Sequence, residues 1–179
     1  MRVKSVTLRH ILFGLFILIV CQPSPLAMAA SNPAIVVLDF ELNDLTLDPG
    51  NAAELERTAS IGPLLREQLK SEYGFELVNI DSDTQSAADQ AFGYLYEHQD
   101  VAAELAGEAE SDWIIVGRLH KPSYLFAYLK ARVIFVETEQ LVAELSVEVK
   151  GSQDRLTAKG VEALARQIAE IVDPARVQP

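Results

Sequence analysis

Residues 141–150 (LVAELSVEVK) alternate between apolar and polar side chains, and this alternation constrains the fold more than any other feature. A period of two predicts a strand with one buried face. The preceding run, 124–136, has the same period, so the two runs predict a long antiparallel hairpin. Its odd-numbered side chains are apolar: Leu125, Ala127, Leu129, Ala131, Val133 and Phe135.

The register of this hairpin follows from parity. If both strands bury their odd-numbered residues, odd must pair with odd, which excludes a two-residue turn at 138–139. A three-residue turn pairs Lys130 with Glu148, and the other allowed register pairs Arg132 with Glu144. Either register places a base opposite an acid, a surface gain of below about 1 kcal/mol.

Three further strands precede the hairpin, at the apolar runs 34–40 (AIVVLDF), 75–80 (FELVNI) and 113–117 (WIIVG). Helical patterns separate them, and residues 41–50 are predicted to be a loop. Alternating strands and helices indicate parallel strands joined by right-handed crossovers. We therefore predict an α/β domain with an α+β-like end. Its mixed sheet has about five strands in the order β-α-β-α-β-β-β-α, with helices packed on it.

The first and last helices have clear boundary signals. Asn51 is a good N-cap, and Glu54 three residues later suggests a capping box. Pro63 predicts a kink or a restart, because proline lacks the N–H that the helix needs there. The last helix is predicted over residues 156–172 from the i, i+3, i+4 spacing of six apolar residues: Val161, Leu164, Ala165, Ile168, Ile171 and Val172.

The N-terminus has the pattern of a secretory signal peptide. Three basic residues precede the apolar run 11–20, which is short for a membrane span, and the A-x-A pattern 27–29 follows. We predict that residues 1–29 are cleaved, leaving 30–179 as one domain in the periplasm or outside the cell. The alternative is a lipoprotein anchored through Cys21, although Val20 stands where such sites have a small residue.

Charge and cysteine usage restrict the partners. The leader holds three of the 15 Lys and Arg residues, so the remainder has 12 basic and 26 acidic side chains, a formal charge of −14. This balance argues against nucleic acid and anionic membrane surfaces, which require clustered cations. After cleavage the chain has no cysteine and therefore no disulfide. The oligomeric state is left open.

Carboxylates cluster after the first strand, where α/β proteins often place sites. Oxygen ligands suit a hard cation, but Pro49 and Leu55 stand where a calcium loop needs Gly and Glu. The alternatives are a small-ligand or cation site and a solvated acidic loop. The candidate residues are Asp39, Glu41, Asp44 and Asp48.

One face of the first hairpin strand carries aromatic and basic side chains of the kind that binding surfaces favour. The alternative is that the last helix covers this face and the rings belong to the core. The candidate partner-binding residues are Tyr124, Phe126, Tyr128, Lys130 and Arg132.

No motif indicates catalysis. His120 and Ser123 lie close in sequence, but sequence proximity is not triad geometry, and no nucleophile-elbow, phosphate-loop, dinucleotide or zinc-protease motif is present. We therefore expect a protein that is not an enzyme and holds no cofactor.

Three stretches resemble a family of secreted proteobacterial proteins of unknown function: 38–42 (LDFEL), 116–123 (VGRLHKPS) and 124–152. Many members carry a C-x-x-C, which YEHQ at 96–99 replaces here. The layout is also distantly similar to TolB amino-terminal and CsgG-like envelope domains, which are assembly and interaction modules. The resemblance implies an interaction or assembly-support domain of the bacterial envelope, with an envelope protein as its partner.

Overall fold

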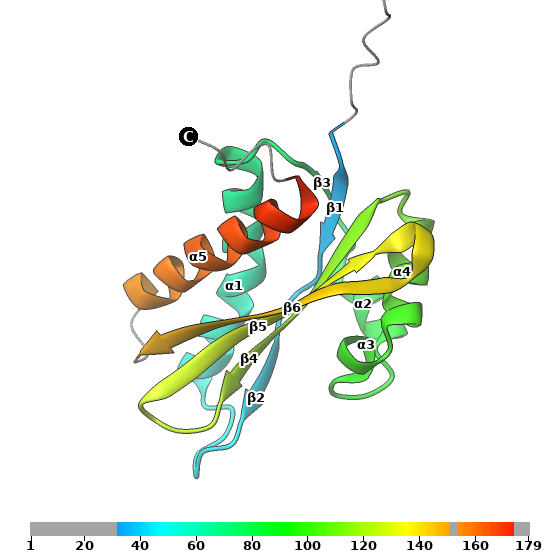
Figure 1. Ribbon diagram of the computed structural model, residues 1–179. Helices are drawn as coiled ribbons and strands as arrows, with labels where there is room; N and C mark the ends of the chain where they lie inside the picture. Colours follow the sequence, from blue (N-terminus) through cyan, green and yellow to red (C-terminus); the bar gives the residue numbers. More distant parts are fainter. Residues whose placement is uncertain (1–31, 151–153, 174–179) are drawn as a thin grey trace, which may run out of the picture. The chain divides into compact units, whose positions relative to one another are not determined.

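The computed structural model describes residues 32–150 and 154–173, shown in Figure 1. The chain divides into the units Met1–Ala30 and Ser31–Pro179, and every described residue belongs to the second. The predicted signal peptide, its cleavage site and Cys21 lie outside the described residues. No helix within 32–150 or 154–173 is long and apolar enough to cross a membrane.

The core of the fold is one mixed sheet with the spatial order β3-β1-β4-β5-β6, and β2 pairs with β4 off this path. β1, β3 and β4 are parallel, whereas β4, β5 and β6 are antiparallel neighbours. The predicted α/β class and mixed sheet are confirmed. The six strands are Ala34–Val37 (β1), Glu41–Asp44 (β2), Glu76–Val78 (β3), Trp113–Lys121 (β4), Phe126–Phe135 (β5) and Gln140–Lys150 (β6).

The additional strand is β2, where the sequence predicted a loop. β1 pairs with the start of β4 and β2 with its end, so both follow the same neighbour in parallel. Between them, the Phe40 ring lies over Gly117, where an added Cβ would be 2.2 Å from Phe40 Cζ. The pairing partner of β2 is distant in sequence, which explains why local pattern did not predict it.

Helices cover both faces of the sheet, as Figure 1 shows. α1 and α5 pack on one face, and the three shorter helices pack on the other. The first core contains Ala127, Leu129, Ala131 and Val133 of β5, and the second contains Ile114, Val116 and Ile134. The helices are Ala52–Ser71 (α1), Ser82–Ala88 (α2), Tyr94–Glu97 (α3), Gln99–Glu108 (α4) and Asp154–Val172 (α5).

The boundaries of α1 are partly as predicted. Asn51 caps it, accepting from the Glu54 amide at 3.1 Å. The helix is continuous through Pro63, so a restart there was wrong. Its buried face contains Ile61, Leu65 and Leu69, whereas Leu55 in its first turn is exposed.

The hairpin adopts the register that pairs Arg132 with Glu144. A bulge between Val133 and Ile134 then shifts the pairing by one residue, so Phe135 lies opposite Gln140. The odd-even pairing that parity excluded therefore occurs, but only between the bulge and the turn. A bulge inserts one extra residue and so reverses the parity.

Candidate functional site

The even-numbered side chains of β5 point away from α5, because α5 packs on the odd-numbered ones. The second core reaches only to Val116 and Ile134, which leaves part of this face without a hydrophobic cover. We call that region the open face. It consists of the cross-strand row Asn43, His120, Tyr128 and Glu148, with Lys130 and Ser146 beside it. Glu41 and Arg118 of the neighbouring row are largely buried, and the Tyr96 ring of α3 covers Arg118.

His120 sits near the middle of the open face. Burial lowers its pKa, and the nearby charges of Lys130 and Arg118 lower it further. Its Nδ1 is 3.2 Å from the Asn43 amide nitrogen, a bond that the neutral ring accepts and the protonated ring cannot. The Tyr128 ring centroid is 6.4 Å away. This environment favours a neutral, structurally bonded imidazole.

Arg132 is not free for a partner, because α3 covers it. The Tyr96 ring has the Arg118 guanidinium 4.1 Å and the Arg132 guanidinium 4.5 Å from its centroid. Arg132 also donates to the Tyr96 carbonyl and lies 3.5 Å from Glu97. These contacts hold α3 against the sheet, so the role of Arg132 is structural.

The four carboxylates after the first strand do not converge. Asp39 pairs with Arg66, and Glu41 pairs with Arg118 at 3.0 Å. Asp44 pairs with Lys121 at 3.4 Å, while Asp48 lies exposed in the following loop. Their cations are on different elements, and among the described residues no three acid, histidine or cysteine side chains gather as metal ligands would.

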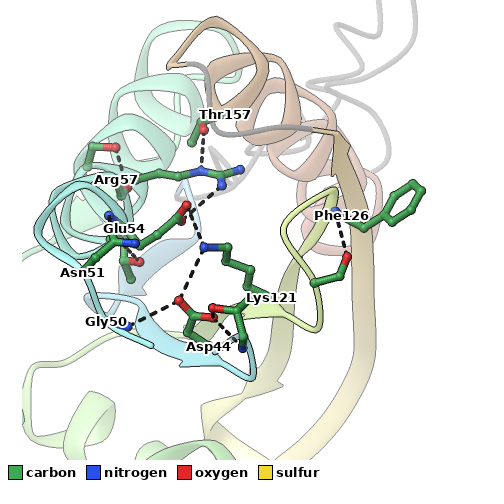
Figure 2. Close-up of polar contacts among 12 residues, drawn as sticks. Asp44, Gly50, Asn51, Glu54, Arg57, Lys121, Phe126 and Thr157 are labelled. Atoms are coloured by element: carbon green, nitrogen blue, oxygen red, sulfur yellow. Dashed lines mark hydrogen bonds and ion pairs between the residues drawn. The ribbon is translucent and has the colours of Figure 1, made fainter. Parts of the chain in front are cut away.

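A buried ion network, drawn in Figure 2, lies beneath the end of β4. Lys121 Nζ is 3.0 Å from Glu54 Oε1, and Glu54 Oε2 is 3.3 Å from Arg57 Nη1. Arg57 Nε donates to Thr157 Oγ1 at 2.9 Å, which links α1 to α5. The sequence assigned Glu54 to a capping box, but its carboxylate binds these two cations instead.

Asp44 completes the network and is held ionised. Burial alone would raise its pKa, but the Thr46 hydroxyl and amide, the Gly50 amide and the charge of Lys121 outweigh burial and lower it. The network then contains two acids and two bases. Such compensation is what buried charges require.

Above this network, two loops, the first turn of α1 and the first residue of β5 present apolar side chains to solvent. The Leu45 amide donates to the Lys121 carbonyl at 2.9 Å, so the loop after β2 leaves the sheet beside the loop after β4. The exposed fraction is 96% for Leu47 and 71% for Leu125. We call this region the apolar end, and it consists of Leu45, Leu47, Leu55, Tyr124, Leu125 and Phe126.

The structure thus divides the predicted aromatic-basic surface. Tyr124 and Phe126 belong to the apolar end, Tyr128 and Lys130 to the open face, and Arg132 to the contact with α3. Tyr124 is 58% exposed and its ring lies 5.5 Å from Lys121 Nζ. The sequence did not predict a role for Leu45 and Leu47, because single leucines in a loop carry no periodic signal.

Comparison with known proteins identifies the family. The model of the family DUF3280, described as "Protein of unknown function (DUF2380)", matches residues 33–168. The chain belongs to this family. The match confirms the predicted resemblance to a family of unknown function. No curated protein matches the chain.

Solved structures resemble the chain at low sequence identity. TolB from Acinetobacter baumannii matches with a TM-score of 0.50 and 13% identity over 80% of this chain and 29% of that chain. The PelC dodecamer from Paraburkholderia phytofirmans gives 0.48 and 12% over 79% and 86%. The LpoB C-terminal domain from Salmonella enterica gives 0.42 and 16% over 66% and 82%. The TolB likeness supports the predicted fold relationship and no more.

Proposed function

We propose that this protein is a non-enzymatic interaction domain of the bacterial envelope, and that it binds an envelope protein through the apolar end. The observation that carries the proposal is where apolar surface is exposed. Six of the nine exposed large hydrophobic side chains of the described residues belong to the apolar end. Exposed apolar side chains that gather in one region mark interaction sites more often than single ones do.

The base of the apolar end is rigid. Lys121, from which the second loop departs, is buried and bonded to Glu54 and Asp44. Within that loop, Ser123 Oγ accepts from the amides of Leu125 and Phe126, both at 3.3 Å. A preorganised loop loses less conformational entropy on binding, so these bonds favour recognition of a partner.

The envelope location rests on the leader pattern of residues 1–29 and on the family resemblance. The non-enzymatic character is supported by the surroundings of His120. Its ring contacts are an amide and a tyrosine ring, and its pKa is lowered by burial and, after that, by nearby cations. A general base needs a substrate proton within reach and is commonly oriented by an acid, whereas the described contacts of the His120 ring are with Asn43 and Tyr128.

Site-specific photocrosslinking in the native bacterium tests the proposal. A photoreactive amino acid replaces Leu47 in one variant, Tyr124 in a second and Leu64 in a third. Leu64 is the matched control, since it is also an exposed leucine but lies in the middle of α1, outside the apolar end. We expect the first two variants to give an adduct with the same envelope protein, and the Leu64 variant to lack it.

Substitutions within the apolar end provide a second test of the proposal. Leu45→Ser/Leu47→Ser, combined with the photoreactive residue at Tyr124, should lose the adduct while its circular dichroism spectrum is unchanged. Adducts that persist in this variant, or that also form at Leu64, would overturn the apolar end as the binding surface.

A further inference from the structure

β6 is an open edge of the sheet. It stands last in the strand order, and among the described residues it pairs only with β5. It has 11 residues, whereas β3 at the opposite edge has three. Figure 1 shows β6 beside β5, at the edge of the sheet. A long edge strand presents unpaired N–H and C=O groups, which another strand can bind.

The two side-chain rows of β6 restrict what can pair with it. The even-numbered row is exposed along the whole strand and carries Glu144, Ser146, Glu148 and Lys150. The odd-numbered row is apolar and half-buried, with Ala143, Leu145 and Val147 packed against the first core. A strand that extends the sheet must therefore add apolar residues on one side and complementary charges on the other.

We propose that a second copy of this chain is that strand, paired antiparallel through β6 with Val147 of each copy on the two-fold axis. An isologous contact of this kind uses the same surface on both copies. Residues 144–150 then form about six to eight inter-strand hydrogen bonds. The pairs across the axis are Glu144 with Lys150, Ser146 with Glu148, and Leu145 with Val149, each occurring twice.

Charge selects this register among the symmetric alternatives. With the axis at Ser146, Glu144 faces Glu148 of the second copy, and with the axis at Glu144 or Glu148 an acid faces itself. An axis at Leu145 avoids acid pairs, but its ladder crosses residues 141–143, where the bulge interrupts the regular strand. An axis at Val149 also pairs Glu148 with Lys150, but only residues 148–150 of β6 lie in its ladder. The axis at Val147 pairs opposite charges and keeps the longer ladder 144–150 within the regular part of β6.

Lys150 is available for this contact. It is the only cation of β6, and 75% of its side chain is exposed. Its contact with Glu148 in the same strand is 3.4 Å at the surface, where such ion pairs contribute little. Glu144 is also accessible, with 44% of its side chain exposed, and its carboxylate lies 3.6 Å from Arg132 Nε on β5, so it would face a cation on each side in the dimer. The formal charge, −11 for the full sequence and −14 without residues 1–29, opposes association in general, so the opposite-charge pairs at this contact favour dimerisation against that repulsion.

Disulfide trapping tests the axis directly. In a Cys21→Ser background, the full chain carries either Val147→Cys or the control Leu145→Cys, and is expressed with its leader so that the host processes it. Only a residue on the axis lies opposite itself, about 4.5 to 5.5 Å between Cα atoms. The two residues 145 are separated by roughly 13 Å, too far for a disulfide. We expect a covalent dimer from Val147→Cys alone.

Charge exchange tests the register independently. Sedimentation velocity should show a dimer for the wild type and about tenfold weaker dimerisation for Lys150→Glu or Glu144→Lys, because each creates two like-charge pairs. The double variant restores both pairs with reversed charges and should dimerise as the wild type does. Glu67→Lys on α1 controls for net charge and should not weaken the dimer.

Three results would overturn the inference: a wild type that stays monomeric at its highest soluble concentration, equal crosslinking at positions 145 and 147, or a double variant no better than the single ones. The inference does not rest on the proposed function, since the apolar end is not part of β6. A photocrosslinked partner without a dimer would overturn only the β6 dimer, and a dimer without a photocrosslinked partner would overturn only the proposed function.

Discussion

Lys121 Nζ lies 3.0 Å from Glu54 Oε1, and both side chains are almost fully removed from solvent. The first residue is the last of β4 and the second lies in the first turn of α1. Their contact therefore fixes the start of a helix to the end of a strand, beneath the apolar end. Because the pair is buried, its removal should have consequences that surface ion pairs do not have.

Lys121→Met should destabilise the protein by about 3 to 5 kcal/mol, because it leaves two buried carboxylates with one cation. Urea unfolding followed by circular dichroism measures the change in the free energy of unfolding. The control is Lys70→Met, an exposed lysine on α1, which should stay within about 0.5 kcal/mol of the wild type. Equal effects of the two substitutions would mean that the buried network contributes little.

Asp44 should make the protein sensitive to acid. Its pKa in the folded state is lower than the usual 3.8. A depressed carboxyl pKa contributes stability that is present above the unfolded value and is lost as the pH falls through the folded value. Stability measured between about pH 5 and pH 2 should therefore fall less steeply for Asp44→Asn than for the wild type.

The control for this pH series is Asp48→Asn, which changes an exposed carboxylate in the neighbouring loop. Its acid profile should follow that of the wild type. Parallel profiles for the wild type and Asp44→Asn would contradict the assignment of a depressed pKa to Asp44.

The lowered pKa of His120 can be tested on the open face. After burial, Lys130 is the largest cause of the shift. Removing that charge with Lys130→Met should raise the pKa of His120 toward its usual 6.5, as measured by NMR titration of the ring proton. Lys159→Met on α5 removes a charge on the other face of the sheet and should leave the titration unchanged. A pKa insensitive to Lys130 would remove that charge as a cause.

The sequence predicted the parts of the fold that depend on local pattern. The alternation in 124–150 predicted the hairpin, its buried odd-numbered row and one of two registers, which the structure adopts as far as the bulge. It did not predict β2, since the residues ELND become a strand only through pairing with β4. The Glu54–Lys121 contact has the same origin, because its two residues meet only after the sheet has formed.

The candidate surface was predictable only in part, for a related reason. The period of two placed Tyr128 and Lys130 on one face with Arg132, but it contains no information about which helix covers which end. Tyr96 arrives from α3 and covers Arg132, while Leu45 and Leu47 join the apolar end from a different loop. These neighbours are set by the crossovers between strands, which local periodicity does not encode.

Gly117 and Phe40 should show strong energetic coupling. An alanine Cβ at position 117 would lie 2.2 Å from Phe40 Cζ, so the ring that packs against β4 must move. Gly117→Ala should cost about 1 to 3 kcal/mol in the free energy of unfolding, as overpacked cores do. In a Phe40→Ala background the same substitution should cost much less, because the ring is absent. A double-mutant cycle by urea unfolding measures this difference.

The matched control is Gly107→Ala on α4, where the only atom near an added Cβ is a methyl carbon of Val136 at 3.6 Å. It should be neutral or stabilise by up to about 1 kcal/mol, since alanine favours a helix over glycine. Additive costs for Phe40→Ala and Gly117→Ala would show that β4 yields to the new methyl group while the ring stays in place.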